Sequence, residues 1–189
     1  LEKRPGTCNS LAMVLKVHPS NYRVEGFVED TSVGELATLG TTVVVDIGGT
    51  MPDGYCSDST RMYAVGPPPD EVRAEIEVLA AAQAAAVAAV RPGVTCEQID
   101  AVARDHLAAA GLAEFFIHRT GHGIGLETHE EPYIVAGNTR VLEPGMAFSV
   151  EPGVYRAGLH GARIEDIVVC TTDGVLRCNN RPHELVVVE

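Results

Sequence analysis

The order of its regular segments constrains the fold of this chain more than any other feature. A β-branched run, TTVVVDI (Thr41–Ile47), ends near an aspartate, and a turn-rich TMPDG leads from it into a second strand-like run, Tyr55–Val65. Together these runs predict a hairpin. Two segments with helical spacing follow, and from Phe115 onward short strand-like pieces are separated by Gly and Pro. This order is typical of an α+β domain whose helices pack against an antiparallel sheet.

Two helices are predicted between the hairpin and the later strands. The first begins after PPPD, with Asp70 as its expected cap, and runs to about Val90 through an Ala-rich sequence. Thr95 and Gln98 form a capping box that begins the second helix. Gly111 occupies the position expected for its C-terminal cap. Both helices carry an apolar stripe, so we expect them to cover a core.

Composition limits the class of protein. The chain has 189 residues, of which 46% are hydrophobic and 21% charged, as in a single globular domain. A net charge of -12 argues against a nucleic-acid partner, which usually needs a basic patch. The five scattered cysteines form no CxxC pair, so we expect a reducing, cytoplasmic location. No stretch reaches the ~20 apolar residues of a spanning helix, so no membrane partner is expected.

The predicted hairpin brings two aspartates together. Asp46 and Asp58 lie six residues either side of Pro52, so a turn near Pro52 would place them directly opposite each other. Carboxylates that close repel unless one takes a proton or a cation lies between them. A metal ion is the simpler explanation for an Asp at the end of an apolar strand. The alternative is that Asp46 caps the strand and Asp58 pairs with Arg61, and the two aspartates alone do not decide.

Three later segments place a polar residue in an apolar strand pattern. His122 lies between glycines in TGHGIG, Glu151 follows MAFSV, and Glu165 lies in ARIEDIVV. With the two aspartates they form an oxygen-rich set that suits Mn²⁺, Co²⁺ or Zn²⁺, and four negative charges would neutralise two divalent ions. Each residue alone also has an ordinary structural explanation. We interpret Asp53 as a turn former and Asp166 as structural.

The ordered segments resemble those of a known family. DIGG, YCSDSTR, HRTGHGIGLETHEEP, SVEPGVY and ARIEDIVV are similar, in that order, to the ligand segments of the pita-bread metallopeptidases. That family includes methionine aminopeptidase, aminopeptidase P and prolidase. The resemblance covers roughly Thr41 to the C-terminus. It implies a pita-bread (creatinase/aminopeptidase-like) α+β fold, a catalytic domain over residues 41–189 and an atypical segment over residues 1–40.

The resemblance also implies a dinuclear metal site. Asp46 would bind one ion, Asp58 and Glu165 would bridge both, and His122 and Glu151 would bind the other. Mn²⁺ is the expected ion, with Co²⁺ or Zn²⁺ as alternatives. A hydroxide held between the ions would then attack the peptide carbonyl.

Further residues are expected to act on the substrate. His118 and His129 match the family's outer histidines, which contact the substrate and stabilise the tetrahedral intermediate or relay protons. Arg163, the HEEP sequence and the short spacing from Glu151 to Glu165 are similar to the proline-directed branch of prolidase, Xaa-Pro dipeptidase and aminopeptidase P. The implied substrate is therefore a peptide with proline in the second position. An Xaa-Pro bond has no N–H, so it needs a dedicated pocket for the ring.

The sequence departs from this branch on its N-terminal side. We find neither the branch's separate N-terminal domain nor its histidine segment before the first aspartate, which is similar to GPNxxxPHH. We therefore expect a fold shortened at the N-terminus, with reduced activity. Two alternatives stay open, a catalytically weak peptide-binding module and a methionine aminopeptidase-like enzyme. The intact ligand set disfavours a metal-independent, creatinase-like hydrolase. A homodimer is left open, because the missing domain often contributes to the family's dimers.

Overall fold

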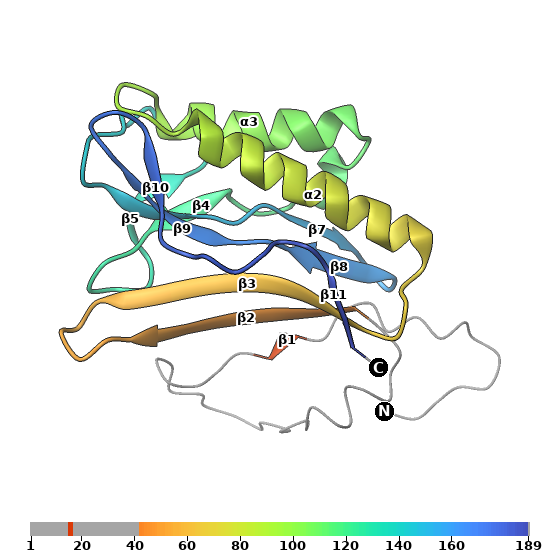
Figure 1. Ribbon diagram of the computed structural model, residues 1–189. Coiled ribbons are helices and arrows are strands. Elements are labelled where there is room, and N and C mark those ends of the chain that lie inside the picture. The colour runs from red at the N-terminus through yellow and green to blue at the C-terminus, as the bar shows by residue number, and fades with distance from the viewer. Residues whose placement is uncertain (1–14, 17–41, 189) are drawn as a thin grey trace.

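The structure is a computed structural model that describes residues 15–16 and 42–188. The predicted atypical segment over residues 1–40 therefore lies almost wholly outside the described residues. Figure 1 shows three layers: the helix pair α2 and α3, a middle layer of short strands, and the long β2–β3 hairpin. The elements are β1 (Leu15–Lys16), β2 (Thr42–Thr50), β3 (Cys56–Val65), α2 (Asp70–Ala89), α3 (Cys96–Ala109), the 3₁₀ turn η2 (Ala113–Phe115), β4 (Gly121–Gly123), β5 (Glu130–Ile134), β6 (Ala147–Val150), β7 (Gly153–Arg156), β8 (His160–Arg163), β9 (Asp166–Cys170), β10 (Val175–Arg177) and β11 (Val186–Val188).

The strands form two sheets and a hairpin. One sheet has the order β1-β2-β3-β11, the other β10-β9-β6-β4-β5, and β7 pairs with β8. The second sheet is antiparallel throughout, whereas β1 and β11 run parallel to their neighbours in the first. An isolated bridge between Thr60 and Glu165 joins β3 to the chain that enters β9. Two distant parts of the sequence thus meet at the residues predicted to bind metal.

The helices form as the sequence predicts, with one difference at the start of α2. The capping box of Thr95 and Gln98 is present, and Gly111 has the positive φ of a C-terminal cap. Asp70 is the first helical residue rather than the cap, because Pro69 takes the cap position and makes no side-chain hydrogen bond. Residues from both helices and from the middle strands share one core, including Ile76, Leu79, Val87, Ile99, Leu107, Phe148, Val150 and Ile164.

The β2–β3 hairpin differs from the prediction in register. Thr50 pairs with Cys56, so the turn centres on Asp53 and not on Pro52. Gly54 takes a positive φ there, and Asp53 Oδ1 accepts a hydrogen bond from the Tyr55 amide, which confirms its turn role. The prediction that Asp46 and Asp58 lie directly opposite is therefore wrong.

Asp46 and Asp58 are diagonal neighbours instead. Asp46 pairs with Thr60 and Asp58 pairs with Gly48. Because side chains alternate along a strand, the two carboxylates still share one face of the hairpin.

Among the described residues, no helix is both long and apolar enough to cross a bilayer.

Candidate metal centre

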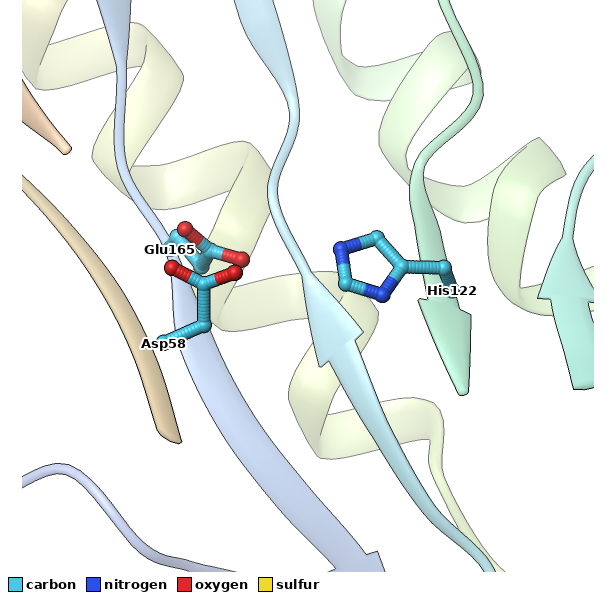
Figure 2. Close-up of side chains that lie close together, drawn as sticks. All are labelled: Asp58, His122 and Glu165. Carbon is cyan, nitrogen blue, oxygen red and sulfur yellow. The ribbon is translucent and has the colours of Figure 1, made fainter. Parts of the chain in front are cut away.

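Three of the predicted ligands converge from three separate parts of the chain. Asp58 comes from β3, His122 from β4, and Glu165 from the link between β8 and β9. One ligand atom from each lies within 4.8 Å of the other two. Figure 2 shows the carboxylates of Asp58 and Glu165 side by side, with the His122 ring facing them from across the site. A carboxylate pair and an imidazole at these distances suit a divalent cation.

Glu165 is the most deeply buried of these carboxylates. Its side chain is 1% exposed, and its Oε2 accepts a hydrogen bond of 2.7 Å from Thr60 Oγ1. Its other oxygen, Oε1, is buried and has no hydrogen-bond partner among the described residues. Burial raises the pKa of Glu165 well above its ordinary value, and the charges of Glu151, Asp58 and Asp46 raise it further. A buried carboxylate oxygen with no hydrogen-bond partner is expected where a bound cation is the partner of that oxygen.

Asp58 shows the same shortage of positive charge. Burial and the neighbouring charge of Asp46 raise its pKa to about 7, although the charge of His122 acts in the opposite direction. Its Oδ1 accepts one hydrogen bond, from the Ser59 amide. The donor set therefore fits a cation: its carboxylates are hard oxygen ligands, and the protein alone does not balance their charge.

His122 is held in a defined orientation. Its Nδ1 lies 3.0 Å from the Gly123 carbonyl oxygen, which can only accept, so Nδ1 carries a proton and Nε2 faces the site. Nε2 lies 3.1 Å from Glu151 Oε1. The flanking glycines are needed because a Cβ at Gly121 would overlap the Ser149 carbonyl oxygen, and one at Gly123 would overlap that of Glu131. Only glycines allow β4 to lie this close to its neighbours.

The pKa values of His122 and Glu151 reflect their contact. Burial alone would lower the pKa of His122, but the hydrogen bond to Glu151 and its charge outweigh burial and raise it. Burial alone would raise the pKa of Glu151, and the hydrogen bond and charge of His122, together with Arg163, lower it instead. Within the described chain, Glu151 is thus compensated by protein groups, whereas Glu165 is not.

Asp46 and Glu151, the other two predicted ligands, share one cation, Arg163. Arg163 Nη2 pairs with Asp46 Oδ2, and Arg163 Nε lies 3.9 Å from Glu151 Oε2. Arg163 Nη1 also donates to the Tyr155 hydroxyl at 3.1 Å. Burial would lower the pKa of Arg163, but the charges of Tyr155, Asp46 and Glu151 raise it, so its charge is permanent here.

The two predicted outer histidines lie at different edges of the site. Burial lowers the pKa of His118, whose Nε2 lies 3.2 Å from the Tyr155 hydroxyl. The His129 ring lies 4.2 Å from that of His122, centroid to centroid, and burial and the charge of His122 lower its pKa. Both rings are therefore neutral near pH 7.

The competing interpretation of Asp58 as a partner of Arg61 is wrong. Arg61 instead donates to Asp166 Oδ1 at 2.7 Å and to the Glu165 carbonyl at 2.5 Å. Asp166 also accepts from Arg177 and His183, at 3.0 Å and 2.8 Å. Asp166 is structural, as predicted.

Comparison with known proteins identifies the family. A model of metallopeptidase family M24 matches residues 13–172. The chain belongs to this family. The resemblance noted in the sequence begins at Thr41, and the family model extends the match upstream of it.

Individual relatives agree with this assignment. The chain is 65% identical over 149 residues to a probable dipeptidase PepE of Mycobacterium bovis, covering 79% of this chain and 40% of that protein. It is 51% identical over 146 residues to an Xaa-Pro dipeptidase of Lactobacillus helveticus, covering 77% and 39%. The chain thus spans about two-fifths of the length of these curated relatives.

Solved structures confirm the predicted pita-bread fold. The dipeptidase PepE of Mycobacterium ulcerans superposes with a TM-score of 0.78 at 66% identity, covering 79% of this chain and 40% of that one. The X-Pro aminopeptidase of Thermotoga maritima superposes with a TM-score of 0.77 at 40% identity, covering 79% and 42%.

This M24 chain also has site residues that are not among those predicted from its sequence. Thr60 and Ser149 hold carboxylates of the site, with Thr60 bonded to Glu165 and Ser149 Oγ lying 3.1 Å from Glu151 Oε1. Each stands two residues from a predicted ligand on the same strand face, so period-two alternation could have identified them. Tyr155 carries no such signal, because its contacts come from the β7–β8 pairing and from His118.

Proposed function

We propose that this chain forms the catalytic part of a metal-dependent peptidase that cleaves the Xaa-Pro bond of dipeptides or of longer peptides at their N-terminus. One observation carries the proposal: the buried Glu165 carboxylate faces three other carboxylates, and one of its oxygens has no hydrogen-bond partner among the described residues. Relatives named Xaa-Pro dipeptidase, prolidase and X-Pro aminopeptidase support the choice of substrate.

Five residues would hold two divalent ions, with Mn²⁺ as the expected metal. Asp58 and Glu165 would be shared between the ions, Asp46 would bind on one side, and His122 and Glu151 on the other. Divalent ions bound there would supply Lewis acidity, which makes water a nucleophile near neutral pH and stabilises negative charge on the substrate carbonyl. With ions bound, these carboxylates would be ionised. Among the described residues, Arg163 forms ion pairs with Asp46 and Glu151, and none is formed with Glu165.

The surrounding residues would orient the substrate and move protons. His118 Nδ1 lies 2.7 Å from the Arg119 carbonyl oxygen, so it carries the proton and Nε2 accepts from the Tyr155 hydroxyl. The Tyr155 oxygen in turn accepts from Arg163. This ordered chain of hydrogen bonds orients His118 and holds Arg163, which pairs with Asp46. The leaving proline nitrogen must gain a proton, and the neutral His118 and His129 are the groups proposed to contact the substrate and relay it.

A side-by-side substrate comparison tests the proposal. The chain, supplied with Mn²⁺, is assayed on an Xaa-Pro dipeptide, a longer Xaa-Pro peptide and a Met-Ala peptide. Hydrolysis of the proline peptides alone supports the proposal, and the preferred length separates dipeptidase from aminopeptidase. Cleavage of the Met-Ala peptide alone would favour a methionine aminopeptidase. Peptide binding without any cleavage would favour a binding module. The cytoplasmic location and a homodimer stay predictions.

A further inference from the structure

Backbone pairing between β3 and the chain that enters β9 consists of a single bridge among the described residues. Thr60 and Glu165 form an antiparallel bridge in which the Glu165 amide donates to the Thr60 carbonyl at 3.2 Å. In an antiparallel ladder the next pair of the same type lies two residues away on each strand. That pair is Asp58 and Ile167, so the Ile167 amide would donate to the Asp58 carbonyl.

The side chain of Asn179 is inserted into that missing hydrogen bond. Its Oδ1 accepts from the Ile167 amide at 2.7 Å, and its Nδ2 donates to the Asp58 carbonyl at 2.9 Å. The orientation of the amide is not ambiguous, because a carbonyl can only accept and an amide N–H can only donate. Asn179 therefore replaces one ladder hydrogen bond by two, with the width of a primary amide between the strands.

The backbone around Asn179 is anchored on both sides. The Cys178 amide donates to the Ile167 carbonyl at 2.9 Å, which continues the β9–β10 pairing by one step. Arg61, which follows Thr60 on β3, donates to the carbonyls of Arg181 and Pro182 at 2.9 Å and 3.0 Å. Asn179 is thus held from the strand that carries Asp58 and from the strand that follows Glu165.

We propose that Asn179 is a positioning residue that sets the separation between the carboxylates of Asp58 and Glu165. The inference rests on the proposed function, in which these two carboxylates share the metal ions. Asp58 is held through its own carbonyl, and Glu165 lies two residues before Ile167, so removal of the amide frees both strands to move. Loss of partners that orient metal ligands costs ~10–100-fold in metal affinity, and we expect a loss in this range.

Matched pairs of variants separate positioning from general stability. Asn179→Leu removes both hydrogen bonds but keeps the number and branching of the side-chain heavy atoms, and the exposed Asn180 supplies the control Asn180→Leu. Asn179→Asp keeps the acceptor but loses the donor to Asp58, and it carries the test if Asn179→Leu does not fold. Asn179→Asp and Asn180→Asp each add one negative charge, which attracts cations. Weaker Mn²⁺ binding by Asn179→Asp alone would therefore result from a change in the position of the ligands and not from charge.

The readouts are Mn²⁺ titration calorimetry, thermal unfolding and a crystal structure of the metal-free Asn179→Leu chain. We expect both Asn179 variants to bind Mn²⁺ at least tenfold more weakly than their Asn180 controls, and the metal-free structure to show Asp58 and Glu165 displaced relative to each other. Mn²⁺ affinity within twofold of the controls would overturn the inference and leave the proposed function intact. If the unmutated chain takes up no Mn²⁺, the proposed function fails, and an unchanged Asp58–Glu165 separation in the metal-free variant overturns the inference as well.

Discussion

Two adjacent buried carboxylates have pKa values shifted in opposite directions. Glu165 and Asp166 are 1% and 0% exposed and are adjacent in sequence. Burial and nearby carboxylates raise the pKa of Glu165 far above its ordinary value. Burial acts on Asp166 in the same direction, but hydrogen bonds from His183 and Arg61 outweigh it and lower its pKa. The chain therefore has a carboxylate side, around Glu165, and a charge-paired side, around Asp166.

The difference shows what distinguishes a site carboxylate from a structural one. Burial does not, because both side chains are buried. The supply of partners does: Asp166 receives Arg61, Arg177 and His183, whereas Glu165 receives one hydroxyl, from Thr60. A buried carboxylate with cationic partners has its charge balanced by the protein and needs no bound ion. Among the described residues, Glu165 has no cationic partner of this kind, and this asymmetry is the physical basis of the proposed metal centre.

The largest expected effect is the loss of metal-dependent activity in Glu165→Gln. Gln cannot supply a shared anionic ligand, so we expect Mn²⁺-dependent hydrolysis of an Xaa-Pro dipeptide to fall by more than ~100-fold, beyond the usual cost of losing an outer partner. The metal-free variant should unfold at the same temperature as the unmutated chain or higher, because a neutral amide relieves the repulsion. Unchanged activity, or a clear loss of metal-free stability, would make Glu165 a structural residue like Asp166.

Asp166→Asn should produce the converse result. The substitution leaves Arg61 and its neighbours without their anionic partner, and breaking a buried ion pair costs ~3–5 kcal/mol. For a chain of this length that corresponds to a fall of ~6–20 °C in Tm, measured by thermal unfolding without metal. Asp173→Asn is the control, because Asp173 is exposed and bonds only Thr171 among the described partners. A Tm equal to that of the control would show that the ion pairs of Asp166 do not stabilise the fold.

The local elements could be predicted from the sequence because local signals determine them. The β-branched run and the capping box at Thr95 predict their elements without knowledge of the rest of the chain. The hairpin register could not be predicted, because it depends on whether the turn centres on Pro52 or on Asp53. A shift of one residue in the turn moved Asp58 from Asp46 to Gly48.

The candidate site was predicted as a set of residues and not as an arrangement. The hairpin points to Asp58, and polar residues in apolar strands point to His122 and Glu165; these three residues do converge. The pairing of Asp46 with Arg163 and the insertion of Asn179 join residues more than a hundred positions apart. Such contacts depend on how strands from different sheets meet, and no period in the sequence encodes them.

The pH dependence of stability should have opposite slopes on the two sides. The pKa of Asp58 is raised from 3.8 to about 7, so its contribution to metal-free stability is full below pH 3.8 and is lost as the pH rises toward 7. The pKa of Asp166 is lowered, so its contribution is present above pH 3.8 and is lost as the pH falls below that value.

Thermal unfolding of the metal-free chain across pH 3 to 8 measures both slopes. Asp58→Asn should flatten the decline between about pH 4 and 7, and Asp166→Asn should flatten the decline on the acid side. Added Mn²⁺ should also remove the decline toward pH 7, because it binds the ionised carboxylates. Equal profiles for the two variants would contradict the comparison.

The smallest expected effect is that of Tyr155→Phe. The hydroxyl lies between Arg163 and His118, and Phe removes both hydrogen bonds while keeping the ring. A hydrogen bond to a charged group contributes ~1.5–3 kcal/mol, so we expect a fall of at least ~10-fold in kcat/KM, with Mn²⁺ affinity little changed. Tyr55→Phe is the control, because Tyr55 is 58% exposed beside the hairpin turn. An equal loss in both variants would show a general effect on the fold.

Metal uptake by the unmutated chain tests the central claim most directly. Titration calorimetry with Mn²⁺ near neutral pH should show about two ions bound per chain, and Glu165→Gln should lose this binding while Asp166→Asn, measured below its Tm, retains it. Absence of uptake by the unmutated chain, or equal uptake by Glu165→Gln, would show that the carboxylate side does not bind metal.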